Sequence, residues 1–468
     1  MQAAEHLSAR LAAHVAGFPA QRLTPRTLAN ASRALLDGLG VMMAASGLSE
    51  DARPFVELAR AQAGPAEASI LGTWERVAVG AAAFANGAQA HALDFEDAFD
   101  AAPSHPNASL IPAALALAQS QPRISGREFL AAMAIGCDLS CRVALAAGAA
   151  LERSPWYPPP IFGAIGAVAA AARLLQLDER QVRDAFSLLL CQLACPGEIK
   201  HSERTVLRAV REAFPASAAV TSAQLAARGV RGFETPLEGK GGFFSLFAAG
   251  EYDASALFAG LGERFYVDEL TFKPWPSCRG THPYIEAAQE LRARYGFDAA
   301  RIRSVQARIG PVQRMLSEPL ARKRAPATVI DAKFSIPFTV AAAFVQPEVT
   351  LDSFAPATLA DPALLALARR VEFDYHERGI SASGGALEVT LDDGSRLAVD
   401  VPEARGGPGR PLDDGRLLGK FVDCAARAAQ PLDADAARAL VDRVLAIDTA
   451  QSFAPALALP HPSLRRPS

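Results

Sequence analysis

The chain up to about residue 265 repeats apolar residues at intervals of three and four, which is the pattern of helices with one buried face. Two of these runs follow clear helix-start signals. Thr24 stands before Pro25, which offers an N-cap and a proline at the first helical position. Asp178 stands three residues before Gln181, which is the spacing of a capping box. The pattern predicts an all-helical domain over residues 1–265.

The pattern changes after this point, because apolar and polar residues begin to alternate as they do in strands. Residues 301–310 (RIRSVQARIG) alternate, and residues 386–402 hold two alternating runs around an Asp-Gly pair, which is typical of a β-hairpin. Residues 281–296 and 332–345 still have helical spacing. We therefore expect a smaller α+β domain at residues 266–402.

Residues 403–468 return to the helical pattern. These helices could pack back on the first domain, which would make the α+β part an insertion. The predicted fold class is thus mainly α, with a large discontinuous all-helical domain and a smaller inserted α+β domain.

Composition narrows the class of protein. The chain has 468 residues, half of them hydrophobic, which is enough to bury the cores of roughly two to four domains. Lysine and arginine (47) nearly balance aspartate and glutamate (50) and form no basic block, so we expect no nucleic-acid partner. No apolar run has the roughly 20 uncharged residues of a membrane span, and the N-terminus is too polar for a signal peptide. We expect a cytoplasmic protein without membrane association.

Several common chemistries lack their motifs. The six cysteines do not suggest a disulfide framework, and they include no CxxC pair that would suggest an iron–sulfur centre. No GxGxxG follows a strand, and no GxSxG is present. Nucleotide-dependent redox chemistry and serine-hydrolase chemistry are therefore disfavoured.

The densest group of reactive side chains is HALDFEDAFDAAPSHPNASL, which begins at His91 and holds four acids and two histidines. We expect a helix whose last turns place His91, Asp94 and Asp97 on one face. A loop with His105 and a new helix near Leu110 should follow, and such loops often carry catalytic groups. Two alternatives stay open. One is a solvated acidic helix end with a satisfied histidine, and the other is a metal site, although the HExxH type of spacing is missing.

A second group is FKPWPSCRGTHPYIEAAQ, a proline-broken loop that ends at a helix start and contains Lys273, Arg279 and His282. Backbone N–H groups and cationic side chains at such a place favour a bound carboxylate. The alternative is a surface loop with incidental charges. GKGGFFSLFAAG, with Lys240 among glycines, is a weaker signal of the same kind, and its spacing is not that of a P-loop.

Five segments in order resemble the MmgE/PrpD family over roughly residues 80–345: NGAQAHALDFEDAFDAAPSHPNASLIPAALALA, IFGAIGAVAAAARLL, GKGGFFSLF, KPWPSCRGTHPYIEAA and DAKFSIPFTVAAAF. That family includes 2-methylcitrate dehydratase, cis-aconitate decarboxylase and iminodisuccinate epimerase. The resemblance implies a helical domain and an α+β domain with the active site in the cleft between them, and usually a homodimer. It also implies a small polycarboxylate substrate, no iron–sulfur cluster and no organic cofactor. Because the HExxH type of spacing is missing, we also expect no metal.

Four family positions keep their residue type, and they fall on Asp94, His105, Lys273 and His282. Two positions differ. Tyr157 stands where the family often has a histidine, and Arg208 stands where a lysine is expected. Tyrosine, with a reference pKa of about 10, is a poor base at neutral pH, and arginine can hold a carboxylate but does not exchange protons.

We hypothesise the following roles for the candidate side chains. His105 would transfer the proton, and Asp94 would orient or tune a neighbouring cation or histidine. Lys273 and Arg279 would bind substrate carboxylates. The other candidates are His282 as a second acid–base group, Tyr157 as a proton donor, and His91, Arg208 and Lys240 as substrate-binding residues.

The family chemistries share one difficult step, which is to make or protonate a carbanion-like centre next to a carboxylate. Our first expectation is a hydro-lyase that acts on a hydroxylated di- or tricarboxylate. The alternatives are an epimerase or racemase of a polycarboxylate, a decarboxylase of a cis-aconitate-like acid, and a non-catalytic polycarboxylate-binding protein.

Overall fold

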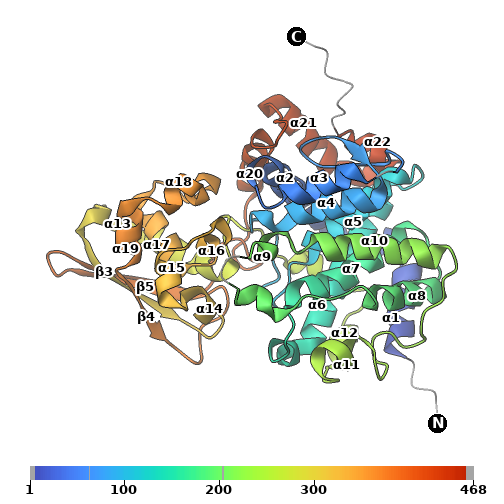
Figure 1. Cartoon of the computed structure of the whole chain (residues 1–468), viewed down its shortest axis with the longest axis horizontal. Helices are drawn as coiled ribbons and strands as arrows, with labels where there is room; N and C mark the ends of the chain where they lie inside the picture. The colour runs from blue at the N-terminus through green and yellow to red at the C-terminus, as the bar shows by residue number, and fades with distance from the viewer. Residues whose placement is uncertain (1–5, 63, 203–204, 460–468) are drawn as a thin grey trace. The chain divides into compact units, whose positions relative to one another are not determined.

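The computed structural model describes residues 6–62, 64–202 and 205–459, and the chain forms two compact units. Unit 1 takes in residues 1–92, 96–270 and 414–468, and unit 2 takes in residues 93–95 and 271–413. Figure 1 shows the helices of unit 1 and the mixed sheet and helices of unit 2. The predicted fold class, a discontinuous helical domain with an inserted α+β part, is confirmed. The domain limits at residues 265 and 402 stay a prediction.

Unit 1 is built almost entirely from helices. They are α1 (Leu7–Gly17), α2 (Pro25–Leu48), α3 (Arg53–Ala61), α4 (Val79–Ala92), α5 (Pro106–Ser120), α6 (Gly126–Glu152), α7 (Pro158–Leu174), α8 (Glu179–Leu190), α9 (Leu207–Val210), α10 (Ala213–Ala227), α11 (Phe243–Ala248), α12 (Ala254–Phe258), α20 (Asp414–Ala426), α21 (Ala434–Leu445) and α22 (Phe453–Leu457). Two short antiparallel strands, β1 (Ala68–Ser69) and β2 (Arg76–Val77), complete it.

Helix starts follow the signals in the sequence. The side chain of Thr24 accepts a hydrogen bond from the backbone N–H of Thr27 at 3.1 Å, which caps α2. Asp178 and Gln181 make both hydrogen bonds of the predicted capping box at the start of α8. These caps satisfy backbone donors that the first helical turn leaves without a partner.

The core of unit 1 depends on a close approach between α6 and α7. A Cβ atom added to Gly136 would lie 2.5 Å from the carbonyl oxygen of Gly166, and one added to Gly166 would lie 2.5 Å from that of Gly136. Only glycine fits both positions. Figure 1 shows α5, α6, α7 and α10 in the middle of the unit, and nearly all residues of α5 and α7 are buried.

Within α6, the 23 residues Gly126–Gly148 are long and apolar enough to cross a membrane. The structure buries 94% of this apolar window inside the protein. The stretch also contains a buried ion pair between Asp138 and Arg142. This helix therefore has the properties of a core helix.

Unit 2 contains a four-stranded sheet in the order β4-β3-β5-β6, with β3 (Ile302–Ile309), β4 (Val371–Tyr375), β5 (Gly385–Leu391) and β6 (Arg396–Val401). β3 and β4 are parallel, and the other neighbours are antiparallel. Gly394 turns the predicted β5–β6 hairpin with a φ of 84°. The helices are α13 (His282–Tyr295), α14 (Arg314–Ser317), α15 (Leu320–Arg324), α16 (Val329–Lys333), α17 (Ile336–Val345), α18 (Pro356–Leu359) and α19 (Pro362–Ala368).

The single helix expected over residues 332–345 is wrong, because the structure divides this stretch between α16 and α17. Phe334 and Ser335 separate the two helices. The side chain of Ser335 accepts a hydrogen bond from the N–H of Phe338 at 3.0 Å and caps the second one. A serine followed two residues later by a proline is a start signal inside an apolar run.

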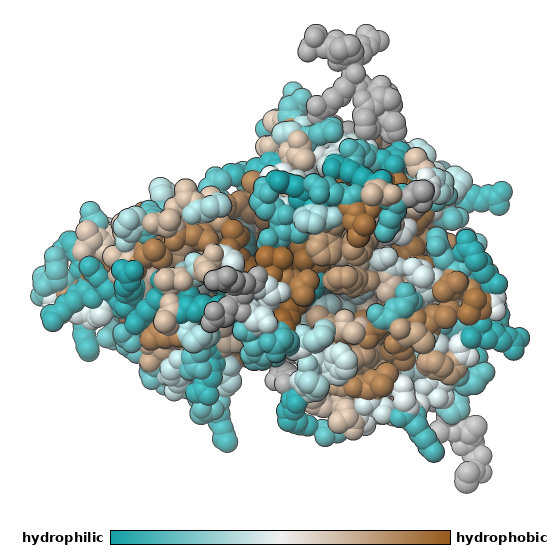
Figure 2. All heavy atoms as spheres, in the orientation of Figure 1, coloured by the Kyte–Doolittle hydropathy of each residue, from teal (hydrophilic) through white to brown (hydrophobic). Residues whose placement is uncertain are grey.

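Apolar side chains also reach the surface, as the brown areas of Figure 2 show. In unit 1, Phe214 on α10 is 51% exposed. Its ring contacts those of Phe55 and Phe84 at centroid distances of 6.0 and 5.9 Å. The three rings form a continuous apolar surface rather than isolated exposed residues.

Candidate active site

The segment after α4 leaves the helix at once. α4 ends at Ala92, and Asp94 has a φ of 48°, in the left-handed region that few residues other than glycine adopt. The prediction that Asp94 and Asp97 extend a helical face from His91 is therefore wrong. The reason is a tertiary contact, because the ammonium group of Lys273 holds the carboxylate of Asp94.

The next helix begins earlier than expected. α5 starts at Pro106 rather than near Leu110, and His105 occupies its N-cap position. Proline suits the first helical position because the N–H that it lacks would have no partner there. His105 is therefore fixed at the end of a rigid helix.

Two histidines of unit 1 share one carboxylate oxygen. Nδ1 of His91 is hydrogen-bonded to Oε1 of Glu96, and Nδ1 of His105 lies 3.0 Å from the same oxygen. The two imidazole rings meet edge to face, with centroids 5.0 Å apart. His91 and Glu96 are buried, whereas 16% of the His105 side chain is exposed. His105 is therefore the member of this cluster that a ligand can reach from solvent.

The contacts of His105 identify which nitrogen carries the proton. Nδ1 lies 2.9 Å from the backbone carbonyl oxygen of Asp97, and a carbonyl can only accept a hydrogen bond. Nδ1 must therefore be the N–H donor. The polar contacts that the structure describes for His105 all involve Nδ1, so Nε2 is the atom that can exchange a proton with a substrate.

A second buried acid belongs to the same region. Glu212 accepts a hydrogen bond from Ser109, which lies one turn after His105 on α5. Nε of Arg211 is 3.1 Å from Oε1 of Glu212. Burial raises the pKa of Glu212, while the charges of Arg211 and His105 act in the opposite direction. Glu212 therefore takes up a proton more readily than an exposed glutamate does.

Tyr157 and Arg208 lie together in the structure, and Arg211 joins them. The guanidinium carbons of Arg208 and Arg211 are 5.5 and 5.0 Å from the centroid of the Tyr157 ring. Both distances suit cation–π attraction. The ring of Tyr157 thus packs against the guanidinium groups of two arginines. The role of Tyr157 as a proton donor stays a prediction.

In unit 2, Lys273 and Asp94 form a fully buried ion pair. Nζ of Lys273 is 2.5 Å from Oδ1 of Asp94 and 3.1 Å from its backbone carbonyl oxygen. A buried charge is costly unless a partner of opposite charge accompanies it, and each residue supplies that partner for the other. Asp94 is therefore next to a cation, as the sequence suggested, while the functional roles of both residues stay predictions.

His282 begins α13 and is also fully buried. Its Nε2 lies 3.1 Å from the carbonyl oxygen of Ser277, so Nε2 is the N–H donor. Burial, together with the charges of Arg279 and Lys273, holds the pKa of His282 well below its ordinary value. The ring is therefore neutral at neutral pH.

Arg279 donates two hydrogen bonds to backbone carbonyls, at 2.7 Å to Arg405 and 2.8 Å to Ala404. These contacts fix the guanidinium group within unit 2. Lys240 differs from the other candidates because it is exposed, on the loop before α11. Within the described part of the chain, no contact joins its side chain to the two histidines of unit 1.

A metal ion would find suitable atoms in the histidine cluster. His91, Glu96 and His105 each offer one ligand atom within 4.8 Å of the others, and two imidazoles with a carboxylate suit a divalent metal. In the structure the two Nδ1 atoms contact the carboxylate directly, which is a hydrogen-bonded arrangement. The expectation that no metal is needed stays a prediction.

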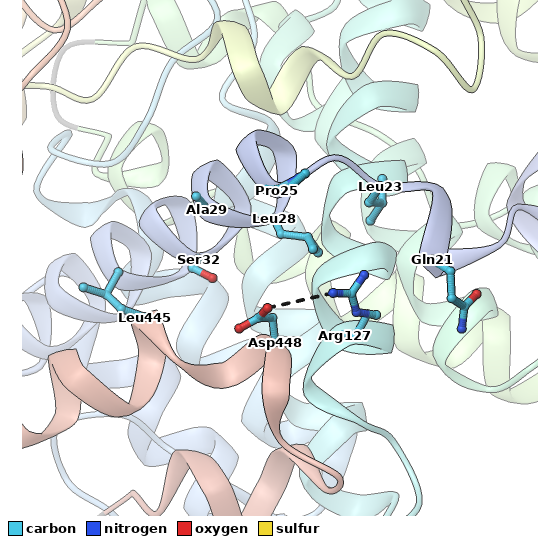
Figure 3. A pocket seen from close by; sticks show the side chains of 9 residues that line it. All are labelled: Gln21, Leu23, Pro25, Leu28, Ala29, Ser32, Arg127, Leu445 and Asp448. Atoms are coloured by element: carbon cyan, nitrogen blue, oxygen red, sulfur yellow. Dashed lines mark ion pairs between the residues drawn. The ribbon is translucent and has the colours of Figure 1, made fainter.

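A separate cavity of about 460 Å³ lies beside the start of α2, and Figure 3 shows its lining. Apolar side chains such as Leu28 and Leu445 face it, and Arg127 and Asp448 form a loose ion pair of 4.0 Å. None of the candidate site residues lines this cavity.

Four residues of the unit 1 site have no motif in the sequence that marks them individually, and they are Glu96, Ser109, Arg211 and Glu212. Glu96 was counted only among the acids of its segment. The adjacent opposite charges of Arg211 and Glu212 within a mostly apolar run were the signal that could have indicated a buried pair.

Comparisons with known proteins agree with this architecture. The MmgE/PrpD N-terminal domain matches residues 9–255, and the MmgE/PrpD C-terminal domain matches residues 275–446. The chain is 26% identical to the cis-aconitate decarboxylase-like protein oryM of Aspergillus oryzae, with 84% of each chain covered. It is 25% identical to cis-aconitate decarboxylase of Aspergillus terreus, again over 84% of each chain, and 25% identical to that of Homo sapiens, over 77% of this chain and 75% of the human one. The chain therefore belongs to the MmgE/PrpD family.

Proposed function

We propose that this protein is a cofactor-independent lyase that decarboxylates a small unsaturated tricarboxylate such as cis-aconitate. The observation that carries the proposal is the fixed orientation of His105, whose Nδ1 is held by Glu96 and the Asp97 carbonyl so that Nε2 can exchange a proton. The names of the relatives supply the substrate class.

In the proposed reaction the bond between a substrate carbon and one carboxylate breaks, and CO2 leaves. The electron pair of that bond moves into the neighbouring carbon–carbon double bond system. Cationic side chains offset the negative charge that develops there, and Lys273, Arg279 and Arg208 keep this role from the sequence-based prediction. The imidazolium form of His105 then delivers a proton to carbon, so the substrate exchanges CO2 for H⁺.

The sequence alone favoured a hydro-lyase over a decarboxylase. Both reactions need proton transfer at a carbon next to a carboxylate, and His105 could serve either. The relatives named as cis-aconitate decarboxylases change the order of preference. A cytoplasmic location and a homodimer remain parts of the proposal.

Proton NMR of the purified protein in D2O tests the proposal, with cis-aconitate, citrate-like hydroxy acids and aspartate-derived dicarboxylates as substrates. We expect cis-aconitate alone to be converted, with loss of CO2, new olefinic signals and deuterium on carbon. Dehydration of a hydroxy acid would restore the hydro-lyase assignment, and deuterium exchange without net conversion would indicate an epimerase. An unchanged ligand after prolonged incubation would indicate a binding protein.

A further inference from the structure

The guanidinium group of Arg211 is almost fully buried, with 2% of the residue exposed. Only some of its N–H donors have a hydrogen-bond acceptor within the protein. Nη1 donates a hydrogen bond to the backbone carbonyl of Arg208, and Nε forms the ion pair with Glu212. The ion pair at Nε does not have hydrogen-bond geometry, and Nη2 is buried and finds no hydrogen-bond acceptor among the described residues. Buried N–H donors nearly always have a hydrogen-bond partner. We therefore expect a bound molecule to supply the acceptor for Nη2.

Arg211 is also linked to the proton-transfer histidine through neighbouring side chains. Glu96, which holds Nδ1 of His105, is among the groups whose charges act on Arg211, together with Tyr157 and Glu212. Glu212 connects Arg211 to Ser109, one turn along α5 from His105. An acceptor bound at Arg211 would therefore be near His105.

We propose that Nη2 of Arg211 donates a hydrogen bond to a carboxylate of the substrate and so positions that substrate beside His105. This inference rests on the proposed function only in assigning the carboxylate to a substrate. The guanidinium group is planar and permanently charged, which suits a carboxylate better than a neutral acceptor. The Tyr157 ring, 5.0 Å from the guanidinium carbon, helps to hold the plane in place.

The neighbouring acid does not satisfy Arg211 completely. Oε1 of Glu212 lies 3.1 Å from Nε without hydrogen-bond geometry, and its other oxygen, Oε2, accepts a hydrogen bond from Ser109. Burial raises the pKa of Glu212, so it gives up its negative charge more readily than an exposed carboxylate. A second carboxylate can therefore share the cation.

Binding of propane-1,2,3-tricarboxylate, a saturated acid that cannot react, tests the inference by isothermal titration calorimetry. Arg211→Lys keeps the positive charge beside Glu212 but removes the Nη2 donor. We expect this variant to bind the probe roughly 10- to 100-fold more weakly, which is the usual effect of losing a charge-assisted hydrogen bond. The matched control is Arg228→Lys at the exposed C-cap position of α10, which should bind like the wild type. Wild-type affinity in a folded Arg211→Lys variant would overturn the inference.

A neutral variant needs a different design, because Arg211→Gln alone leaves Glu212 buried without its cation. The double variant Arg211→Gln with Glu212→Gln removes both charges, and circular dichroism verifies its fold. It should also lose affinity for the tricarboxylate. If the wild type binds the probe through Arg211 but does not decarboxylate cis-aconitate, the proposed function fails and the inference stands. Failure of the wild type to bind the probe would overturn the inference.

Discussion

Oε1 of Glu96 lies 3.0 Å from Nδ1 of His105, and the same oxygen is hydrogen-bonded to Nδ1 of His91. A carboxylate in this place orients the imidazole ring by accepting its Nδ1 hydrogen bond. The carboxylate is buried, so its attraction for the ring is stronger than it would be in water. Glu96 therefore helps to fix the ring orientation that leaves Nε2 of His105 for proton transfer.

His105→Asn should lower the turnover rate of cis-aconitate strongly. Asparagine can still donate a hydrogen bond to the Asp97 carbonyl, but it cannot transfer a proton, and a lost acid–base group typically costs 10²- to 10⁴-fold in rate, roughly. The side chain is partly exposed, so the variant should fold normally. Steady-state kinetics and thermal melting measure both properties. Turnover within a few-fold of the wild type would exclude His105 as the proton-transfer residue.

Glu96→Gln should lower kcat by roughly 10- to 100-fold, as is typical when the partner that orients an active imidazole is changed. KM should change little, because the variant leaves the cationic side chains in place. The control is Glu57→Gln on α3, which makes the same charge change at an exposed position. An equal loss in both variants, or a change confined to KM, would contradict the positioning role.

Sequence patterns predicted the elements that depend on local spacing. Helical periodicity and caps at Thr24 and Asp178 indicated α2 and α8, and alternation around Gly394 indicated the β5–β6 hairpin. Those features arise from contacts between residues that are neighbours in the chain. The break at Ser335 had a local signal as well, but the surrounding apolar run concealed it.

The site was predicted less completely because its geometry comes from contacts distant in sequence. The conformation of Asp94 follows from its pairing with Lys273, 179 positions further along the chain. Glu212 reaches Ser109 across 103 positions. Family resemblance pointed to Asp94, His105, Lys273 and His282 by residue type, but no periodicity distinguishes a buried acid such as Glu212 from one on a solvated helix face.

The buried pair of Asp138 and Arg142 should make stability depend on pH. Burial raises the pKa of Asp138 to about 6, although Arg142 acts to lower it. An acid with a raised pKa in the folded state contributes stability below its ordinary value near 4, and this contribution is lost as the pH rises through about 6. Relative to Asp138→Asn, the free energy of unfolding of the wild type should increase by on the order of 2–3 kcal/mol between pH 7 and pH 4. Urea unfolding at several pH values measures it, and parallel curves for the two proteins would rule out this role.

Removal of divalent metals should leave activity unchanged. The direct contacts between the histidine Nδ1 atoms and Glu96 describe hydrogen bonds, and the proposed proton transfer needs no Lewis acid. After dialysis against EDTA we expect full turnover and less than stoichiometric metal by elemental analysis. Loss of activity that zinc restores would instead identify His91, Glu96 and His105 as ligands.

The hydroxyl group and the aromatic ring of Tyr157 can be tested separately, because each would make a different contribution. The ring faces Arg208 and Arg211, so Tyr157→Phe preserves the cation–π surface and removes only the hydroxyl group. If Tyr157 acts only through its ring, Tyr157→Phe should keep kcat within about threefold of the wild-type value. Tyr157→Ala should raise KM by about tenfold, because Arg208 and Arg211 would lose the ring that holds them in position. Full kinetics on both variants separate the two roles. A loss of kcat by 10²-fold or more in Tyr157→Phe, roughly the contribution of a general acid, would show that the hydroxyl group donates a proton.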